Sequence, residues 1–188
     1  TLEALVCAPN PPSGCVLLWA ANVVTFSDGA NQITPNDPID ALGDTPLTSW
    51  SMGVGGSITL DFGSDFTNSG NTDTDLCIRE WNDNDCYYVS VSPANAATDT
   101  LLSAAGFALN GGFYDLPALY CGDVDIDLDA LIPGQAEATM AFGAVKITDD
   151  GASGSGGNGA EMEQVCGLVC PQVSNCVITF ATTVDAST

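Results

Sequence analysis

Hydrophobic positions along this chain occur in short runs, often alternating with polar positions, and clusters of Gly, Asn, Asp, Ser and Pro separate the runs. The runs are rich in Val, Ile, Thr and aromatic residues, which is typical of β-strands. Strands are predicted over residues 15–26 (bent, or two strands), 56–62, 75–81, 86–92, 123–129, 139–148, 161–168 and 176–184. The pattern predicts an all-β fold, an antiparallel jelly-roll-type β-sandwich with little helix.

One segment, 94–109, is the only place where the pattern accommodates a short helix. Long loops are predicted over residues 27–49, 63–74, 110–122 and 149–160. Loops on a β scaffold commonly carry binding sites. With no repeat and no strong linker, the chain is predicted to be a single domain over 1–188, with the sandwich over 16–168 and Cys-bearing terminal extensions at 1–15 and 169–188.

The charge of the chain is strongly one-sided. There are 24 acidic residues against two basic ones, Arg79 and Lys146, which gives a net charge of −22. Such a surface repels nucleic acid and anionic membranes, since binding phosphates requires Lys and Arg. Nucleic acid is therefore excluded as a partner, and hard cations or high salt are expected to stabilise the fold.

Eight cysteines indicate four disulfides and an oxidising compartment. They are Cys7, Cys15, Cys77, Cys86, Cys121, Cys166, Cys170 and Cys176. The sequence begins at Thr1 without a secretory leader, so we expect a mature exported product that is secreted, extracellular or at the cell surface. No apolar run is long enough to span a bilayer, and membrane insertion is not expected.

Cysteine spacing suggests which pairs form. Cys77 and Cys86 flank an acidic turn between two strand-like runs, and Cys7 and Cys15 bracket a Pro-rich loop, so each of these pairs is predicted to form a local bridge. The other four cysteines allow three connectivities. Cys121–Cys166 and Cys170–Cys176 are favoured, the second because it closes a small loop.

Residue types also limit the chemistry that this chain can perform. Histidine is absent, which removes the commonest general base and any Ser-His or Cys-His pair. One Lys and one Arg leave almost nothing for Schiff-base or phosphoryl chemistry. We therefore expect a protein that is not an enzyme, with a carboxylate-pair glycosidase as the remote alternative.

Three ordered groups of segments carry a resemblance to a known family. They are DALGDT (40–45) with SMGVGGSITLDFG (51–63), NTDTDLCIRE (71–80) with YYVSVS (87–92), and DIDLDAL (125–131) with AVKITDDG (144–151) and AEMEQV (160–165). Together they resemble bacterial secreted or cell-surface galactose-binding-like (discoidin-like) β-sandwich domains. The resemblance covers about 40–168 and implies a non-catalytic module for adhesion, carbohydrate contact or surface assembly. The Cys-bearing ends, and Cys77 and Cys86, depart from the pattern.

The resemblance also implies a structural calcium ion. In similar sandwiches a loop after the first strand and a Glu on the last strand hold the ion. Applied to this chain, the loop residues are Asp40 and Asp44 and the last-strand residue is Glu163, with Asp44 and Glu163 as the side-chain ligands. The alternative interpretation is that these acids are solvated surface residues.

Further calcium candidates come from the spacing of acids in loops. The first group is Asp73 and Asp75 with Glu80, the second is Asp83, Asn84 and Asp85, and the weakest is Asp149 and Asp150. Such clusters wrap cations, but they form polar turns as often, since Asn and Asp bond to their own backbone. In GDVDIDLDAL, alternation places Asp123, Asp125, Asp127 and Asp129 on one strand face, which is either solvated or bridged by cations to a neighbour.

Aromatic side chains could stack on sugar rings, although in sandwiches they more often belong to the core. The candidates are Trp50, Trp81, Tyr87, Tyr88, Tyr114 and Tyr120. Trp81 is favoured as a ligand-binding residue because it lies beside the acidic turn.

The leading functional hypothesis is a calcium-stabilised extracellular structural or adhesive protein that self-associates into a surface layer, sheath or filament. The alternative is a carbohydrate-binding module, so the expected partners are further copies of the chain, extracellular matrix or carbohydrate. Residues 176–184 (CVITFATTV) form an apolar run that must pair with something. It either folds back onto its own sandwich or adds to the sheet of a neighbouring subunit.

Overall fold

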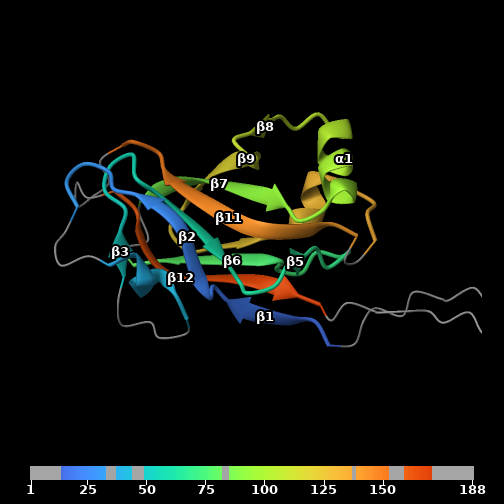
Figure 1. Cartoon of the computed structure of the whole chain (residues 1–188), viewed down its shortest axis with the longest axis horizontal. Helices are drawn as coiled ribbons and strands as arrows, with labels where there is room; N and C mark the ends of the chain where they lie inside the picture. The colour runs from blue at the N-terminus through green and yellow to red at the C-terminus, as the bar shows by residue number, and fades with distance from the viewer. Residues whose placement is uncertain are drawn as a thin grey trace, which may run out of the picture.

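The chain forms two antiparallel β-sheets that pack face to face as a sandwich, with one α-helix at one end (Figure 1). A computed structural model describes residues 14–32, 37–43, 49–81, 85–136, 139–152 and 159–170. The predicted all-β sandwich with little helix is confirmed.

The first sheet has five strands. Its order is β1 (Val16–Trp19), β12 (Glu161–Val169), β6 (Leu76–Glu80) and β10 (Val124–Ile126), and β3 (Trp50–Ser51) also pairs with β12. The second sheet has seven strands. Its order is β2 (Asn22–Ser27), β4 (Ser57–Asp61), β11 (Ala141–Asp149), β7 (Cys86–Pro93), β9 (Phe113–Cys121) and β8 (Leu109–Asn110), and β5 (Phe66–Thr67) also pairs with β11.

Alternation along the strands builds the core between the sheets. On β4, Ile58 and Leu60 are fully buried, while Ser57 and Thr59 lie on the face turned away from the core. The same alternation recurs on the neighbouring strands of the seven-stranded sheet. From the other sheet, Leu76 and Val165 contribute fully buried side chains. The two sheets therefore share one hydrophobic core.

Three short helices join the strands in the described part of the chain. The α-helix α1 (Ala96–Ala104) begins at Asn95, whose side chain accepts a hydrogen bond from the amide of Thr98 at 2.9 Å, as is usual for an N-cap. The 3₁₀-helices are η1 (Pro38–Ala41) and η2 (Leu128–Leu131). None of the helices in the described part of the chain has the length and apolar character needed to cross a membrane.

Most predicted strands are confirmed within one or two residues, and the range 15–26 is indeed two strands, β1 and β2. The helix predicted within 94–109 is α1. The range 123–129 is strand only as far as Ile126, and 176–184 lies outside the described residues.

The loop predicted over 110–122 is wrong, because most of it is the nine-residue strand β9. Pro117 conceals this strand in the sequence, since proline lacks the amide that a sheet ladder uses. In the structure Pro117 lies where the register between β7 and β9 shifts, between the pairs Tyr88–Leu119 and Ser90–Asp115. A bulge tolerates proline, so the strand continues through it.

The disulfide pairing predicted from the sequence is also wrong. The structure pairs Cys15 with Cys170, Cys77 with Cys166, and Cys86 with Cys121. All four predicted pairs, namely Cys77–Cys86, Cys7–Cys15, Cys121–Cys166 and Cys170–Cys176, conflict with these bridges. The remaining cysteines, Cys7 and Cys176, lie outside the described residues.

Sheet topology explains the error. Cys77 lies on β6 of the five-stranded sheet and Cys86 lies on β7 of the seven-stranded sheet, so the acidic turn between them is a crossing between sheets and not a hairpin. Two of the observed bridges instead join neighbouring strands of one sheet, and Cys15–Cys170 joins the residues that flank the neighbouring strands β1 and β12. Cys77 is directly opposite Cys166, and Cys86 is directly opposite Cys121.

Candidate functional site

Three aspartates meet where β10 gives way to η2. The strand ends at Ile126, and Asp127 caps the 3₁₀-helix by accepting a hydrogen bond from the amide of Asp129 at 2.9 Å. The four-carboxylate strand face predicted for GDVDIDLDAL is therefore wrong beyond Ile126. Asp125 is ion-paired with Arg79 at 2.7 Å.

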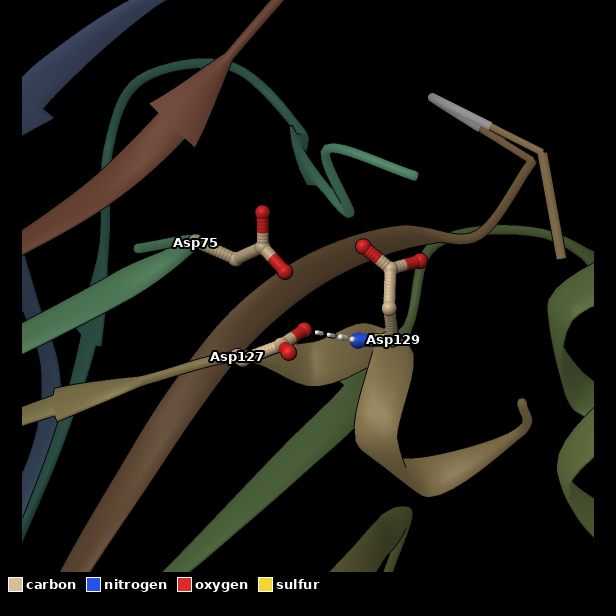
Figure 2. Close-up of side chains that lie close together, drawn as sticks. All are labelled: Asp75, Asp127 and Asp129. Carbon is tan, nitrogen blue, oxygen red and sulfur yellow. Dashed lines mark hydrogen bonds between the residues drawn. The ribbon is translucent and has the colours of Figure 1, made fainter. Parts of the chain in front are cut away.

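Asp75, Asp127 and Asp129 form what we call the aspartate cluster (Figure 2). One carboxylate oxygen from each lies within 4.8 Å of the other two. Among the residues that the structure describes, this is the one group of three or more acidic, Cys or His side chains that meets this criterion. Asp75 is among the metal candidates predicted from the sequence, but with the partners Asp73 and Glu80.

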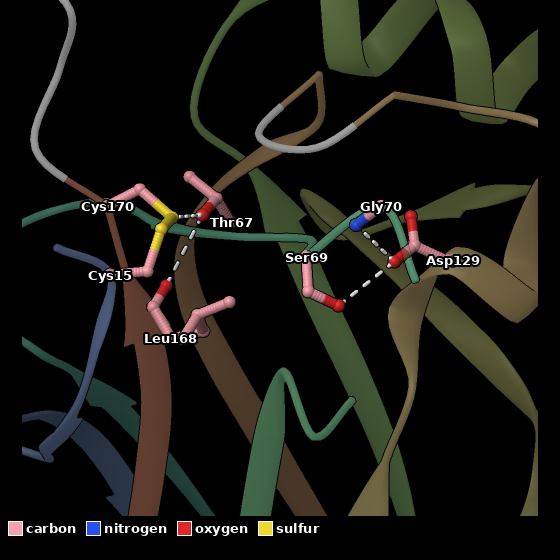
Figure 3. Close-up of a disulfide and its surroundings, with 7 residues drawn as sticks. All are labelled: Cys15, Thr67, Ser69, Gly70, Asp129, Leu168 and Cys170. Atoms are coloured by element: carbon pink, nitrogen blue, oxygen red, sulfur yellow. Dashed lines mark hydrogen bonds between the residues drawn. A yellow bond between two sulfur atoms is a disulfide. The ribbon is translucent and has the colours of Figure 1, made fainter. Parts of the chain in front are cut away.

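Asp129 is held from the loop that follows β5. Its carboxylate accepts a hydrogen bond from the side-chain amide of Asn68. It also accepts hydrogen bonds from the hydroxyl of Ser69 at 3.2 Å and from the backbone amide of Gly70 at 2.6 Å (Figure 3). Asn68 also fixes the loop by accepting a hydrogen bond from the amide of Met140 at 2.8 Å. The position of Asp129 is therefore determined by residues about 60 positions earlier in the sequence.

Asp75 is fully buried immediately before β6. Its Oδ2 atom accepts a hydrogen bond from the amide of Leu128 at 2.8 Å, whereas its Oδ1 atom is buried without a hydrogen-bond partner. Burial is the main cause that raises the pKa of Asp75 to about 6, and the negative charge of Asp129 adds to the rise. Ser69 and the Leu128 amide oppose the rise, but neither reaches Oδ1 with hydrogen-bond geometry.

The partners that the sequence assigned to Asp75 lie elsewhere. Asp73 is exposed, and Glu80 is buried at the other end of β6, where one of its carboxylate oxygens accepts a hydrogen bond from the amide of Glu161. At about 3.3 Å per residue, the five-residue separation along β6 places Asp75 and Glu80 about 16 Å apart. The predicted Asp73–Asp75–Glu80 site is therefore not assembled.

The residues implied by the family resemblance are only partly described. Asp40 is half-buried on η1, and Glu163 is half-buried on β12 where its pairing with β6 shifts register. Asp44 lies outside the described residues, as do Asp83 and Asn84 of the acidic turn, while Asp85 is buried. The calcium site implied at Asp40, Asp44 and Glu163 stays a prediction.

Asp149 has a structural role. Its buried carboxylate accepts hydrogen bonds from three backbone amides, those of Gly55 at 2.7 Å, Gly151 at 2.9 Å and Ala160 at 2.8 Å. Asp150 is half-buried and accepts one hydrogen bond, from the amide of Ala152. Asp149 thus ties the end of β11 to two loops.

The aromatic candidates separate clearly by burial. Trp50, Tyr87 and Tyr114 are core residues with at most 2% of their surface exposed, so they are not available for stacking. Trp81 is 51% exposed and Tyr88 is 48% exposed. Trp81 remains a ligand-binding candidate by exposure alone.

A second feature is a polar groove on the face of the seven-stranded sheet that is turned away from the core. Its volume is about 260 Å³. We define this polar groove by its lining residues, which are Thr25, Phe26, Ser27, Ser57, Thr59, Ser90, Asn110, Gly111, Phe113, Asp115 and Lys146.

The register of five strands creates this groove. The pairing places one residue of each strand in a single row across the sheet. In order, the row is Thr25 on β2, Thr59 on β4, Lys146 on β11, Ser90 on β7 and Asp115 on β9. The hydroxyl of Ser90 donates a hydrogen bond to Asp115 at 2.6 Å. A continuous row of polar groups therefore crosses the sheet: two Thr hydroxyls, the Lys ammonium, the Ser hydroxyl and the Asp carboxylate.

Lys146 is the centre of this row. The chain has two basic residues, and among the described residues the one ion pair is that of Arg79 with Asp125. Lys146 therefore has no described carboxylate within ion-pair distance. The groove was not predicted from the sequence, because its residues come from six strands and none is unusual within its own segment. The usable signal was that one of only two basic residues lies in the middle of a predicted strand.

No protein-family model matches the chain, and no curated protein matches it. Among solved structures, it is similar to a chain in the crystal structure of reduced XRCC1 bound to the DNA pol beta catalytic domain, with a TM-score of 0.53 and 14% identity over 83% of this chain and 99% of that one. It is also similar to a family 32 carbohydrate-binding module from C. perfringens NanJ in complex with galactose, with a TM-score of 0.44 and 14% identity over 85% of this chain and 96% of that one.

At this identity the first likeness shows the fold alone, which is the β-sandwich already described. The second likeness is too weak to bear on function.

Proposed function

We propose that this chain is a non-catalytic extracellular binding domain whose ligand is a saccharide held in the polar groove. The observation that carries the proposal is the cross-strand row from Thr25 to Asp115, with Lys146 at its centre. Ser and Thr hydroxyls both donate and accept hydrogen bonds, Asp accepts and Lys donates. This mixture complements the hydroxyl groups of a sugar, which themselves donate and accept.

The surroundings of the row support the same ligand class. Phe113 adds aromatic surface to the lining, and carbohydrate rings pack their apolar faces on such side chains. The volume of about 260 Å³ lies below the range of about 300–1,000 Å³ for drug-sized ligands, which favours a mono- or disaccharide unit. The lining contains one carboxylate, Asp115, whereas glycoside hydrolysis ordinarily uses two. Binding without hydrolysis is therefore the function that the groove supports best.

The proposal is tested by screening the disulfide-intact protein on an array of neutral and acidic glycans and measuring the best ligand by calorimetry. Removing a hydrogen bond with a charged donor costs about 1.5–3 kcal/mol, so Lys146→Met is expected to weaken binding at least about tenfold. Thr148→Ala is the matched control, because Thr148 lies two residues further along β11 and outside the groove lining. Equal affinity of Lys146→Met and wild type would sink the proposal, as would an array without any bound glycan.

A second candidate function is self-association, and the observation that favours it is the exposure of β1. Within the described residues this strand is at the end of its sheet and pairs with β12 alone. All four of its residues, Val16, Leu17, Leu18 and Trp19, are apolar and between 37% and 51% exposed. Exposed apolar edge strands are templates for pairing with another strand.

The occupant proposed for this edge is the run 176–184 of a second copy, which has the composition of a strand. Deleting residues 171–188 is expected to convert any assembly seen by light scattering into monomer while the circular dichroism spectrum is retained. Leu17→Lys should have the same effect by charging the edge. If both variants assemble like the full-length protein, this second function is wrong.

A further inference from the structure

The aspartate cluster is distinct from the polar groove and from the sites predicted in the sequence. It lies at one end of the five-stranded sheet, where β6 begins and β10 ends (Figure 2). Three carboxylates converge there with ligand oxygens within 4.8 Å of one another. At this distance like charges repel strongly unless a proton or a cation lies between them.

A second observation points independently to a ligand. Asp75 has no exposed surface, and its Oδ1 atom has no hydrogen-bond partner. A buried carboxylate oxygen without a donor is costly, and native proteins seldom retain one without a bound group to satisfy it. Figure 2 shows that one oxygen of the Asp75 carboxylate is directed toward the carboxylates of Asp127 and Asp129.

The rest of the cluster is built as metal sites are built. Asn68, Ser69 and Gly70 donate to Asp129 and fix the direction of its carboxylate, and the Asp129 amide does the same for Asp127. Hydrogen bonds of this kind orient ligands from outside a coordination shell. They leave lone pairs on the carboxylate oxygens for a cation.

We propose that Asp75, Asp127 and Asp129 bind one hard divalent cation, with calcium as the preferred ion. All three groups offer oxygen atoms only, which suits calcium and magnesium rather than zinc or copper. Calcium ligands on opposite sides of the ion lie about 4.6–5.2 Å apart, twice a bond length of 2.3–2.6 Å, so oxygens within 4.8 Å can share one ion. Backbone carbonyls and water complete its coordination.

The ion would join segments that are far apart in the sequence. Asp75 immediately precedes β6, and its backbone bonds to β10 and β12, with its amide donating to Ile126 and its carbonyl accepting from Leu168. The loop that holds Asp129 starts at Thr67, whose hydroxyl contacts the carbonyl of Leu168 and Sγ of Cys170 (Figure 3). The cation and the Cys15–Cys170 bridge would thus both stabilise the same end of the sandwich.

The test uses the full chain, freed of metal with chelator and titrated with calcium or magnesium at constant ionic strength. Calorimetry is expected to show one calcium site, with a dissociation constant in the range of about 10⁻⁴–10⁻³ M that is usual for extracellular modules. At a hundredfold excess of calcium over that constant, the melting temperature should rise by about 5–10 °C, and less in magnesium.

Two variants and one control locate the ion. Asp75→Asn and Asp127→Asn should each lose most of the calcium-induced rise, and Asn at position 127 still accepts the capping hydrogen bond, so that variant is expected to fold. Asp73→Asn removes one charge from an exposed position in the same loop and should keep the full rise. A full rise in both cluster variants, or no calcium response in wild type, would overturn the site. Glycan binding by these variants separates the result from the groove proposal.

Discussion

At the scale of single residues, the acids of this chain have different roles that their sequence surroundings do not distinguish. Asp149 receives three backbone hydrogen bonds, Asp125 pairs with Arg79, and Asp75 is buried with one oxygen unsatisfied. The partners of Asp149 include Gly55, which is 94 residues away in the sequence. Burial and hydrogen bonding are therefore what separate a structural acid from a ligand.

Replacing Asp149 with Ala is expected to destabilise the fold. Three backbone amides would lose their acceptor, and two of them, those of Gly55 and Ala160, belong to the two loops that Asp149 ties to the end of β11. With buried groups left unsatisfied at about 1–3 kcal/mol each, we expect a loss of about 3 kcal/mol or more. Thermal unfolding should show a fall of about 6–12 °C. Asp150→Ala, which removes one hydrogen bond, is the control and should change the midpoint by less than about 3 °C.

Asp75 makes the cation-free protein sensitive to pH. Its pKa is raised from 3.8 to about 6 in the folded state, so between these values the folded chain binds more protons than the unfolded chain. Stability from this group is therefore greatest below pH 4 and is lost as the pH rises toward 6 and above. The loss is on the order of 3 kcal/mol.

Chemical denaturation in chelator at several pH values checks this expectation. Asp75→Asn cannot ionise, so its stability should exceed that of the wild type at pH 7 and fall less between pH 4 and 7. An identical pH profile for Asp75→Asn and wild type would contradict the assignment.

At the scale of elements, alternation and composition were sufficient to predict eight strands, in seven of the predicted regions, and the helix, but not which strands are neighbours in space. Hydrophobic alternation depends on the residues of one strand, whereas disulfide pairing and strand order depend on topology. Cys77 and Cys86 illustrate this, since a nine-residue separation resembles a hairpin although the strands belong to different sheets. The aspartate cluster and the polar groove were missed for the same reason.

The disulfides give a direct check of strand order. Peptide mapping without reductant should join Cys77 to Cys166, Cys86 to Cys121 and Cys15 to Cys170. Alkylation of the denatured, unreduced chain should add no label, because we expect Cys7 and Cys176 to be oxidised as well. A peptide joining Cys77 to Cys86 would contradict the placement of β6 and β7 in separate sheets.

At the scale of the whole molecule, the net charge of −22 opposes the compact state. Raising the ionic strength from about 0.01 M to 1 M shortens the Debye length from about 30 Å to 3 Å and screens this repulsion. The melting temperature in chelator should therefore rise steadily with sodium chloride. Potassium chloride should give the same curve, because screening does not depend on which monovalent ion is used. A flat or falling curve would show that charge repulsion is not a major term.

The Cys15–Cys170 bridge has a mechanical consequence. It joins the chain just before β1 to the chain just after β12, so a pulling force applied at the two ends passes through the S–S bond and not through the strands between them. The sandwich therefore carries no tension while the bridge is intact. Under load the oxidised domain behaves as an inextensible link, and only reduction of this one bond allows force to unravel it.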